Sequence, residues 1–308
     1  MTRFLVTGAF GCIGAWTVRV LLDEAVPVTA LDIGDDPYRL RLVLDAEQFD
    51  RVEIVRGDVT DLGGLERIVR EGGISHVVHL AAMLIPQIKA NPSHGASVNV
   101  VGTTNVFEVA KRCGIRGVSF ASSAAVYGPH DGGGNDDART PATLYGVFKR
   151  TNEETARVYW DDDGVGSVGL RPYIVYGPGR DTGVTAAPTL AMEAAARDES
   201  FRIPFGGRCQ LQYAPDAART FVAAARAEHG GAAVFNLGGP VSQMRDVVGA
   251  IGAAAPEAAG RITFDDVQLP FPEELDPGDL ERVVGHTPST PLADGVRETI
   301  ERFRAAAR

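Results

Sequence analysis

Cysteine and long apolar runs are scarce in this sequence of 308 residues. The three cysteines, Cys12, Cys113 and Cys209, are odd in number and far apart, so they give no disulfide framework and favour a reducing, cytoplasmic compartment. No apolar run approaches the length of a membrane span, and a strand predicted from residue 3 or 4 leaves no room for a signal peptide. We therefore expect a soluble intracellular protein with no membrane partner.

Lysine is scarce as well, since Lys89, Lys111 and Lys149 are the only three, and the 30 basic residues leave a net charge of −10 against 40 acidic ones. No basic stretch offsets this acidity, so we expect no nucleic-acid partner. The six histidines form no ligand pattern, since His76 and His79 would face opposite sides of a strand. We expect no metal site, and no serine hydrolase triad is readable.

Glycine is informative near the start of the chain. An apolar run ends at Thr7, three glycines follow at three-residue spacing, and a helix-like pattern begins directly afterwards. A strand, a glycine turn and a helix together present backbone N–H groups to a pyrophosphate, and a Cβ in the turn would block that approach. The cofactor contacts predicted in this turn are Gly8, Phe10, Gly11, Cys12, Ile13 and Gly14.

The next predicted strand, residues 26–32, ends in Asp32, about 20 residues beyond the glycine turn, where a ribose-binding carboxylate belongs. Such a carboxylate accepts both ribose hydroxyls of NAD and repels the 2′-phosphate of NADP. Residues 33–36 add acidic side chains and no arginine. The sequence therefore predicts dinucleotide binding with NAD as the cofactor.

Strand and helix patterns alternate from residue 1 to about residue 170, which predicts parallel βαβ units. The predicted strands are residues 3–7, 26–32, 52–56, 76–80, 117–121 and 167–171. The predicted helices are residues 12–24, 37–45, 62–71, 93–113 and 144–161. The fold class is therefore α/β, a Rossmann-type doubly wound parallel sheet that binds ligands at the carboxyl ends of its strands.

The composition of the sequence changes after residue 172, where proline and glycine become frequent and the predicted helices and strands are short. We expect an NAD-binding domain at residues 1–172 and a smaller C-terminal substrate-binding lobe at residues 173–308, with residues 214–237 returning to the main sheet. The polar, glycine-rich segment 131–137 predicts a mobile loop, for which a role as a lid is open.

Tyr145 and Lys149 form the second informative pattern. Residues four apart share one face of a helix, so a phenol and an ammonium can point into one cavity. A free phenol has a pKa of about 10, too high for a base at neutral pH, and an adjacent ammonium favours its ionised form. The alternative is a surface helix with a solvated lysine. Ser123, just after the predicted strand 117–121, would lie at the mouth of the same crevice, although alone it would be read as a strand-ending serine.

Together these motifs resemble the extended short-chain dehydrogenase/reductases of the NAD-dependent epimerase/dehydratase family over nearly the whole chain. The likeness is carried by the glycine turn, Asp32, residues 57–59 and 79–82, Asn99, residues 102–103, Ser123, Tyr145, Lys149, residues 171–180 and residues 287–300. The resemblance implies that Tyr145 is the general acid/base, that Lys149 lowers its pKa and holds the nicotinamide ribose, and that Ser123 hydrogen-bonds the reacting oxygen. It also implies cofactor contacts at Asp58, Val59, Ala81, Ala82, Asn99 and Pro172.

The reaction type is open between members of that family. Its dehydratases usually carry an acidic pair just after the active hydroxyl residue, where this chain has Ala124 and Ala125. Its nucleotide-sugar enzymes usually hold the diphosphate with an asparagine and an arginine. Residues 181–188 contain no asparagine, and residues 269–276 are acidic and apolar. A net dehydrogenase acting on a secondary alcohol of a sugar, sugar acid or similar small molecule is slightly favoured. The alternatives are a UDP-sugar 4-epimerase type of enzyme with recycled NAD and a catalytically silent NAD-binding regulator.

The expected partners of the site are a sugar-like substrate and a second copy of the chain. The expected substrate contacts are Met83, Ser123, Tyr145, Arg180, Arg208 and Gln212. Ordinary ion pairs are an equal alternative for the two arginines. The predicted helices 93–113 and 144–161 resemble those that pair across a dimer interface in this family, so a homodimer is expected.

Overall fold

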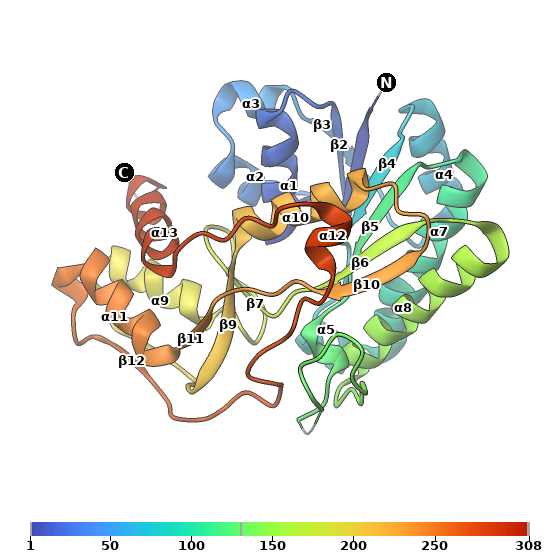
Figure 1. The fold of residues 1–308 in the computed structure, drawn as a ribbon. Helices are drawn as coiled ribbons and strands as arrows, with labels where there is room; N and C mark the ends of the chain where they lie inside the picture. Colours follow the sequence, from blue (N-terminus) through green and yellow to red (C-terminus); the bar gives the residue numbers. More distant parts are fainter. Residues whose placement is uncertain (1, 130, 307–308) are drawn as a thin grey trace.

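The computed structural model describes residues 2–129 and 131–306, and a seven-stranded sheet runs through its centre (Figure 1). All neighbouring strands of this sheet are parallel, in the order β10-β6-β5-β4-β1-β2-β3. The strands are β1 (Phe4–Thr7), β2 (Val28–Asp32), β3 (Glu53–Arg56), β4 (His76–His79), β5 (Gly117–Ala121), β6 (Ser167–Arg171) and β10 (Ala232–Asn236). The predicted doubly wound α/β fold is confirmed.

Helices cover both faces of the sheet. The helices on one face are α1 (Cys12–Asp23) and α10 (Ala214–Arg226), and those on the other are α4 (Leu62–Glu71), α7 (Gly102–Cys113) and α8 (Leu144–Asp163). The first three residues of β1 are apolar because Phe4 and Val6 enter the core with α1 and α10, whereas Leu5 enters the core with α4 and α7. No helix within the described residues is long and apolar enough to cross a membrane.

The strand order reverses at β1, which pairs with β2 on one side and with β4 on the other. In a doubly wound sheet the connections leaving two such neighbouring strands run to opposite faces and leave a crevice at their carboxyl ends. This reversal places the glycine turn after β1 opposite the segment after β4.

The two histidines of β4 are structural. His79 is buried, and its ring nitrogens hydrogen-bond the hydroxyls of Thr7 at 2.7 Å and Thr103 at 3.0 Å. Burial lowers the pKa of His79 to about 3, with the charge of Lys149 adding to the effect, so this ring is neutral. The ring of His76 stacks on Phe4 instead, so neither histidine is available to a ligand.

The predicted helix 93–113 is interrupted. It consists of α6 (Pro92–Ala96), a π-helical turn (Ser97–Val101) and α7. Inside the turn the Asn99 side chain accepts from the backbone N–H of Met83 at 2.7 Å and donates to its carbonyl at 3.0 Å. The extra residue of a π turn has no signature in hydrophobic spacing, and such turns are frequent at functional sites.

The C-terminal lobe has its own core beside the main sheet (Figure 1). A three-stranded sheet joins β7 (Ile174–Tyr176), β9 (Arg208–Tyr213) and β11 (Val241–Gln243), and β8 (Phe201–Ile203) pairs with β12 (Ile262–Phe264). The remaining helices are α2 (Tyr38–Val43), α3 (Ala46–Asp50), α5 (Ile85–Ala90), α9 (Ala187–Ala196), α11 (Met244–Ala254), α12 (Leu280–Val284) and α13 (Leu292–Ala306). Because α10 packs on α1 and β10 pairs with β6, we propose the division stated above, with residues 214–237 assigned to the NAD-binding domain.

The segment 131–137, for which a mobile loop is predicted, is tied to the edge of the main sheet. The Gly133 carbonyl accepts from the backbone N–H of Asp276 at 2.8 Å, and the Asn135 side chain donates to the Val234 carbonyl at 2.9 Å. No residue of the segment lines the large cavity described below. The segment therefore bridges β10 and the lobe, and nothing in its placement supports a lid.

A buried ion pair connects α8 to the sheet. Glu153 of α8 and Arg171 of β6 meet through two hydrogen bonds, of 2.7 and 2.9 Å, and their side chains are 5% and 2% exposed. Glu153 also accepts from the Ser122 hydroxyl, and Arg171 donates to the Tyr127 hydroxyl at 3.0 Å. Every charge of the pair is thus hydrogen-bonded, which is the condition under which burying it is tolerated.

Replacing Glu153 with alanine should lower the free energy of unfolding by about 3–5 kcal/mol, because it leaves the Arg171 guanidinium buried without its counter-charge. Urea denaturation followed by circular dichroism measures this. The control is Glu154→Ala, which removes the adjacent half-exposed carboxylate of α8 and its surface pair with Arg157, and should cost less than about 1 kcal/mol. Equal effects of the two substitutions would contradict the assignment.

Candidate active site

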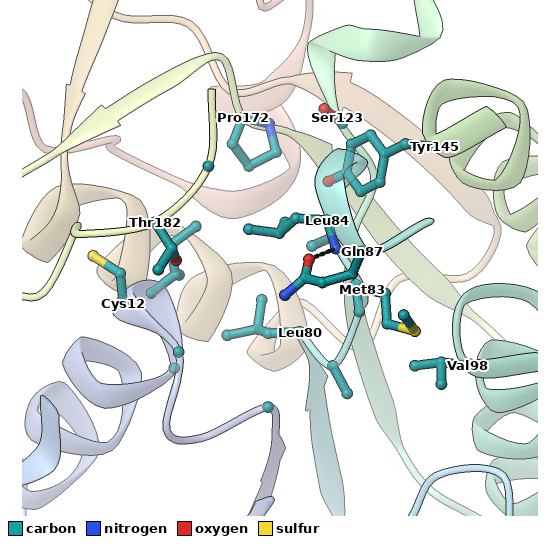
Figure 2. Close-up of a pocket in the computed structure, with 18 of the residues that line it drawn as sticks. Cys12, Leu80, Met83, Leu84, Gln87, Val98, Ser123, Tyr145, Pro172 and Thr182 are labelled. Carbon is teal, nitrogen blue, oxygen red and sulfur yellow. Dashed lines mark hydrogen bonds between the residues drawn. The ribbon is translucent and has the colours of Figure 1, made fainter. Parts of the chain in front are cut away.

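A cavity of about 630 Å³ runs along the carboxyl ends of β1, β2, β4 and β5 (Figure 2). Its walls come from the glycine turn and Asp32, from the segments after β4 and β5, and from residues 172–185 of the lobe. Figure 2 shows the Tyr145 hydroxyl directed into this cavity, toward the segment that carries Leu84 and Gln87. The cavity occupies the crevice that the reversal of strand order creates.

The glycine turn is packed too closely for side chains. A Cβ on Gly8 would lie 2.6 Å from the Ala81 nitrogen, and the residue has a φ of +69°. A Cβ on Gly14 would lie 2.2 Å from the Gly8 carbonyl oxygen. The glycine turn therefore packs directly against the segment after β4, and the first residues of α1 line the cavity, where their N–H groups could serve a pyrophosphate.

The Asp32 carboxylate is fixed at the end of β2. One oxygen accepts from the backbone N–H of Phe10 at 2.8 Å and the other from that of Gly34 at 3.0 Å. The carboxylate therefore stands beside the glycine turn on the cavity wall, where it can accept further hydrogen bonds from ribose hydroxyls.

Arg39 also lines the cavity, although the sequence of residues 33–36 predicted only acidic side chains and no arginine near the ribose-binding Asp32. Its guanidinium donates to the Phe10 carbonyl at 2.8 Å and the Gly179 carbonyl at 3.0 Å, and forms an ion pair with Asp181. These bonds tie the glycine turn to the lobe, so the arginine is not free for a 2′-phosphate. No local motif marks it, because its lobe partners are more than 100 residues away.

A second contact joins the glycine turn to the same lobe segment. The Trp16 indole N–H donates to the Pro178 carbonyl at 2.9 Å, and the Cys12 thiol lies 3.9 Å from the same oxygen. Burial raises the pKa of Cys12 to about 12, against the lowering effect of Arg180 and Arg39, so the thiol is protonated. The segment 178–181 is thus held over the glycine turn at several points.

Tyr145 and Ser123 are brought together by close backbone packing. Thr143 caps α8 by accepting from the Gly146 N–H at 3.1 Å, and a Cβ on Gly146 would lie 2.0 Å from the Ala125 carbonyl oxygen. The start of α8 therefore rests on the turn that follows β5. That turn begins at Ser123, whose hydroxyl oxygen accepts from the Ala125 N–H at 3.1 Å.

Burial acts on Tyr145 and Lys149 in opposite senses. It raises the pKa of Tyr145, while the Ser123 hydroxyl and the charge of Arg180 lower it. It lowers the pKa of Lys149 to about 8, while Glu153 raises it. The Lys149 ammonium donates to the Ala121 carbonyl at 2.6 Å and lies 5.7 Å from the centre of the Tyr145 ring. A phenol and a cation thus share one enclosed space, an arrangement suited to proton transfer.

Most of the predicted site residues line this one cavity. They are Gly8, Phe10, Gly11, Cys12, Ile13, Gly14, Asp32, Asp58, Val59, Ala81, Ala82, Met83, Ser123, Tyr145, Lys149, Pro172 and Arg180. Sequence reasoning did not single out other lining residues, including Arg39, Leu84, Gln87, Tyr173, Thr182, Thr185 and Phe271. Several of these come from α5 or the lobe and have no spacing that would mark them.

Three predicted site residues lie outside the cavity lining. Asn99 is behind the wall and holds Met83 in place. Arg208 pairs at the lobe surface with the carboxylates of residues 273 and 274. Gln212 accepts from the Tyr173 N–H at 2.8 Å and lines a separate cavity of about 200 Å³. Asn99 and Gln212 therefore act on the cavity only through the residues that they position.

Together the cavity and its residues fit a nicotinamide dinucleotide. The glycine turn provides a cradle that a Cβ would fill, Asp32 provides the ribose acceptor, and Ser123, Tyr145 and Lys149 occupy the region where a reacting alcohol would meet the cofactor. The fold and this set define the class of NAD-dependent oxidoreductases and epimerases of the extended short-chain dehydrogenase/reductase type.

The chain belongs to the NAD dependent epimerase/dehydratase family, which it matches over residues 4–238. It is 30% identical to the UDP-glucose 4-epimerase of Mycolicibacterium smegmatis over 98% of both chains. The UDP-glucose 4-epimerase of Thermus thermophilus, solved in complex with NAD, is 26% identical with a TM-score of 0.81, over 99% of this chain and 100% of that one. The L-threonine dehydrogenase of Clostridium difficile shares the fold at 21% identity, with a TM-score of 0.85 over 99% and 98% of the two chains. The protein is thus an NAD-dependent enzyme.

The substitution Asp32→Asn should weaken NAD binding about tenfold, since it removes the charge from the ribose acceptor, and should reduce the discrimination against NADP. Titration of NADH and NADPH by fluorescence measures both effects. The matched control is Asp35→Asn, at an exposed carboxylate that pairs with Arg56 outside the cavity lining. An unchanged NADH affinity in Asp32→Asn would refute the role of this carboxylate.

Proposed function

We propose that the protein is a net NAD-dependent dehydrogenase that oxidises a secondary alcohol of a sugar, a sugar acid or a similar small polar molecule. The observation that best supports this proposal is the convergence of Ser123, Tyr145 and Lys149 in the cavity that also contains Asp32 and the glycine turn. The set retains each group that alcohol oxidation needs, which argues against a silent NAD-binding regulator.

In the proposed reaction Ser123 hydrogen-bonds the alcohol oxygen and Tyr145, as phenolate, takes its proton. The C–H hydrogen leaves with its electron pair, and NAD supplies the acceptor for that hydride when it is bound. Lys149 favours the phenolate by its charge, as does the positive nicotinamide ring. Lowering the pKa of a phenol by about three units requires about 4 kcal/mol of differential stabilisation. In this enclosed site the charge of Lys149 is little screened by water.

The available charges support a small substrate over a nucleotide sugar. Arg208 is paired with two carboxylates and Arg39 with Asp181, so neither is free to hold a diphosphate. A cavity of about 630 Å³ must also accommodate the dinucleotide, which leaves limited room for a second ligand of similar size. Both observations favour net oxidation of a small molecule.

A UDP-sugar 4-epimerase is the second candidate function. It is favoured by the 30% identity with the Mycolicibacterium smegmatis UDP-glucose 4-epimerase over 98% of both chains. An epimerase would use the same three residues, but it would return the hydride to the opposite face of the oxidised carbon and keep its cofactor.

The two candidates differ in whether NADH accumulates. The purified enzyme with excess NAD is tested on free sugars, sugar acids, small hydroxy acids and UDP-sugars, with absorbance at the NADH band and chromatography of the sugars. Stoichiometric NADH from one substrate class supports the dehydrogenase. A changed UDP-sugar without net NADH would establish the epimerase and overturn the main proposal.

Tyr145→Phe should reduce turnover by at least about 100-fold, because general acid–base catalysis contributes factors of that size, while NADH binding stays within about threefold. The measurement combines turnover of the substrate identified above with NADH titration. Tyr159→Phe is the control, because this tyrosine also lies on α8 but contacts Glu108 away from the cavity. Retained turnover in Tyr145→Phe would refute the assigned acid/base.

We also propose that the protein is a homodimer joined through α8. Leu144 and Val147 are one turn apart on this helix, Val158 lies three turns beyond Val147 on the same face, and each of the three is more than 40% exposed. Val101, in the neighbouring π turn, is also exposed. Such an apolar stripe on two adjacent helices fits a symmetric partner with the same stripe.

A charge in this stripe should separate the subunits. Val147→Asp is expected to convert a dimer into a monomer at micromolar concentration, as measured by light scattering after size-exclusion chromatography, because a carboxylate would be buried without a partner. Val267→Asp, the same change at an exposed lobe residue, is the control. A monomeric wild-type protein under these conditions would refute the dimer.

We further propose a reducing, cytoplasmic location. All three cysteines, Cys12, Cys113 and Cys209, are free in the structure. Burial raises the pKa of Cys209 as well as that of Cys12 to about 12, so both thiols are chemically quiet. Free, protonated thiols support a setting in which disulfides are not required.

A further inference from the structure

Arg180 lines the cavity without a carboxylate partner among the residues that the structure describes. Arg39 is paired with Asp181, and Arg208 is paired with two glutamates. Within residues 2–129 and 131–306, Arg180 has one side-chain hydrogen bond, from Nη2 to the Thr185 hydroxyl at 3.1 Å. Its Nε is buried and has no hydrogen-bond partner. A buried donor on a cation is costly unless it meets an acceptor, so this group is placed for a ligand.

The backbone around the guanidinium is shaped to hold it against the cavity. Gly183 has a φ of +98°, and a Cβ there would lie 3.2 Å from Nη2 of Arg180 and 3.4 Å from Cδ1 of Leu84. The guanidinium is therefore enclosed by the Gly183 backbone on one side and by the apolar side chain of Leu84 nearby. Both Arg180 and Thr185 line the cavity. An apolar surrounding strengthens the attraction of this charge for an anion.

The guanidinium is also close to the reacting groups. Its charge acts on the Tyr145 phenol, whose pKa it lowers. The charge lowers the pKa of Cys12 as well, and Arg180, Cys12 and Tyr145 all line the same cavity. The N–H groups at the start of α1 already serve the pyrophosphate, which leaves Arg180 for the substrate.

We propose that the substrate carries a carboxylate that is bound by Arg180 and Thr185, and that the enzyme is therefore a hydroxy-acid dehydrogenase. This inference rests on the proposed function. The planar guanidinium matches the two oxygens of a carboxylate, and the Thr185 hydroxyl, which accepts from Nη2, adds a further polar group beside it. A single guanidinium suits one negative charge better than it suits a diphosphate.

The carboxylate takes no part in the chemical step. The alcohol proton passes to Tyr145, the hydride passes to NAD, and a hydroxy acid becomes an oxo acid with its carboxylate unchanged. Binding that group near the phenol fixes the alcohol carbon against the nicotinamide. Orientation of this kind lowers the barrier to hydride transfer.

The first test compares matched acids and neutral molecules. D-glucuronate is set against D-glucose, and 3-hydroxybutyrate against 2-butanol, for the wild type, Arg180→Gln and the control Arg197→Gln. Arg197 is an exposed residue at the end of α9 that pairs with Glu193. We expect kcat/KM for at least one acid to exceed that of its neutral match by about 100-fold or more. Arg180→Gln should lower the acid value by about 10- to 100-fold and the neutral value by a clearly smaller factor, because the charge of Arg180 also favours the Tyr145 phenolate.

Two results of this test would overturn the inference. One is equal or better oxidation of the neutral molecules by the wild type. The other is a similar loss on acids and neutral molecules in Arg180→Gln together with weaker NADH binding, which would assign the arginine to the cofactor pyrophosphate. NADH titration of Arg180→Gln also shows whether the variant is folded.

A second test does not depend on turnover. Malonate is titrated into the enzyme–NADH complex, and the fluorescence of the bound cofactor is followed. Malonate binding that weakens at least about tenfold in Arg180→Gln but not in Arg197→Gln supports the carboxylate site. This support holds even if no alcohol is oxidised. That outcome would contradict only the dehydrogenase proposal. Oxidation of neutral alcohols with no malonate binding overturns the carboxylate site alone.

Discussion

The buried ion pair between Glu153 and Arg171 is the interaction on which the site depends. This buried pair joins α8 to β6, and Glu153 also accepts a hydrogen bond from the Ser122 hydroxyl, just after β5. Tyr145 and Lys149 precede Glu153 on the same helix by two turns and one turn, so their placement follows from this pair. A charged pair inside the core thus helps to fix the position of α8, which carries the proposed catalytic residues, against the sheet.

The same burial that makes the site enclosed also opposes charge on both of its titrating groups. It raises the pKa of Tyr145 and lowers that of Lys149 to about 8, so near and above that pH the protein alone favours a neutral phenol beside a neutral amine. Glu153 acts against this tendency by favouring the ammonium. The buried carboxylate is therefore both a structural anchor for α8 and a source of negative potential behind Lys149.

The local patterns of the sequence were sufficient for the fold and for the cofactor half of the site. The glycine turn, Asp32 and the pair Tyr145 and Lys149 each depend on fixed spacing within one βα unit or one helix, so counting residues finds them. The contacts of Arg39 and Gln212 could not be found in this way. Arg39 joins segments about 140 residues apart, and Gln212, on β9, hydrogen-bonds the backbone of Tyr173, which is 39 residues away in the sequence. The π turn at Asn99 was not predicted. One inserted residue leaves the spacing of apolar residues close to that of an uninterrupted α-helix.

The bonds that hold the lobe over the glycine turn have a kinetic consequence. Arg39 and Trp16 hydrogen-bond the segment 178–181 and hold it over the glycine turn, where the pyrophosphate is expected to bind. A dehydrogenase has to exchange its cofactor in every cycle, so in the proposed reaction opening of these bonds would be part of each turnover. In an epimerase the same hydrogen bonds would have to open only when the enzyme first binds its cofactor. The strength of these contacts therefore governs how readily the cofactor exchanges, which matters for a dehydrogenase that consumes NAD stoichiometrically and not for an epimerase that regenerates its bound cofactor in each cycle.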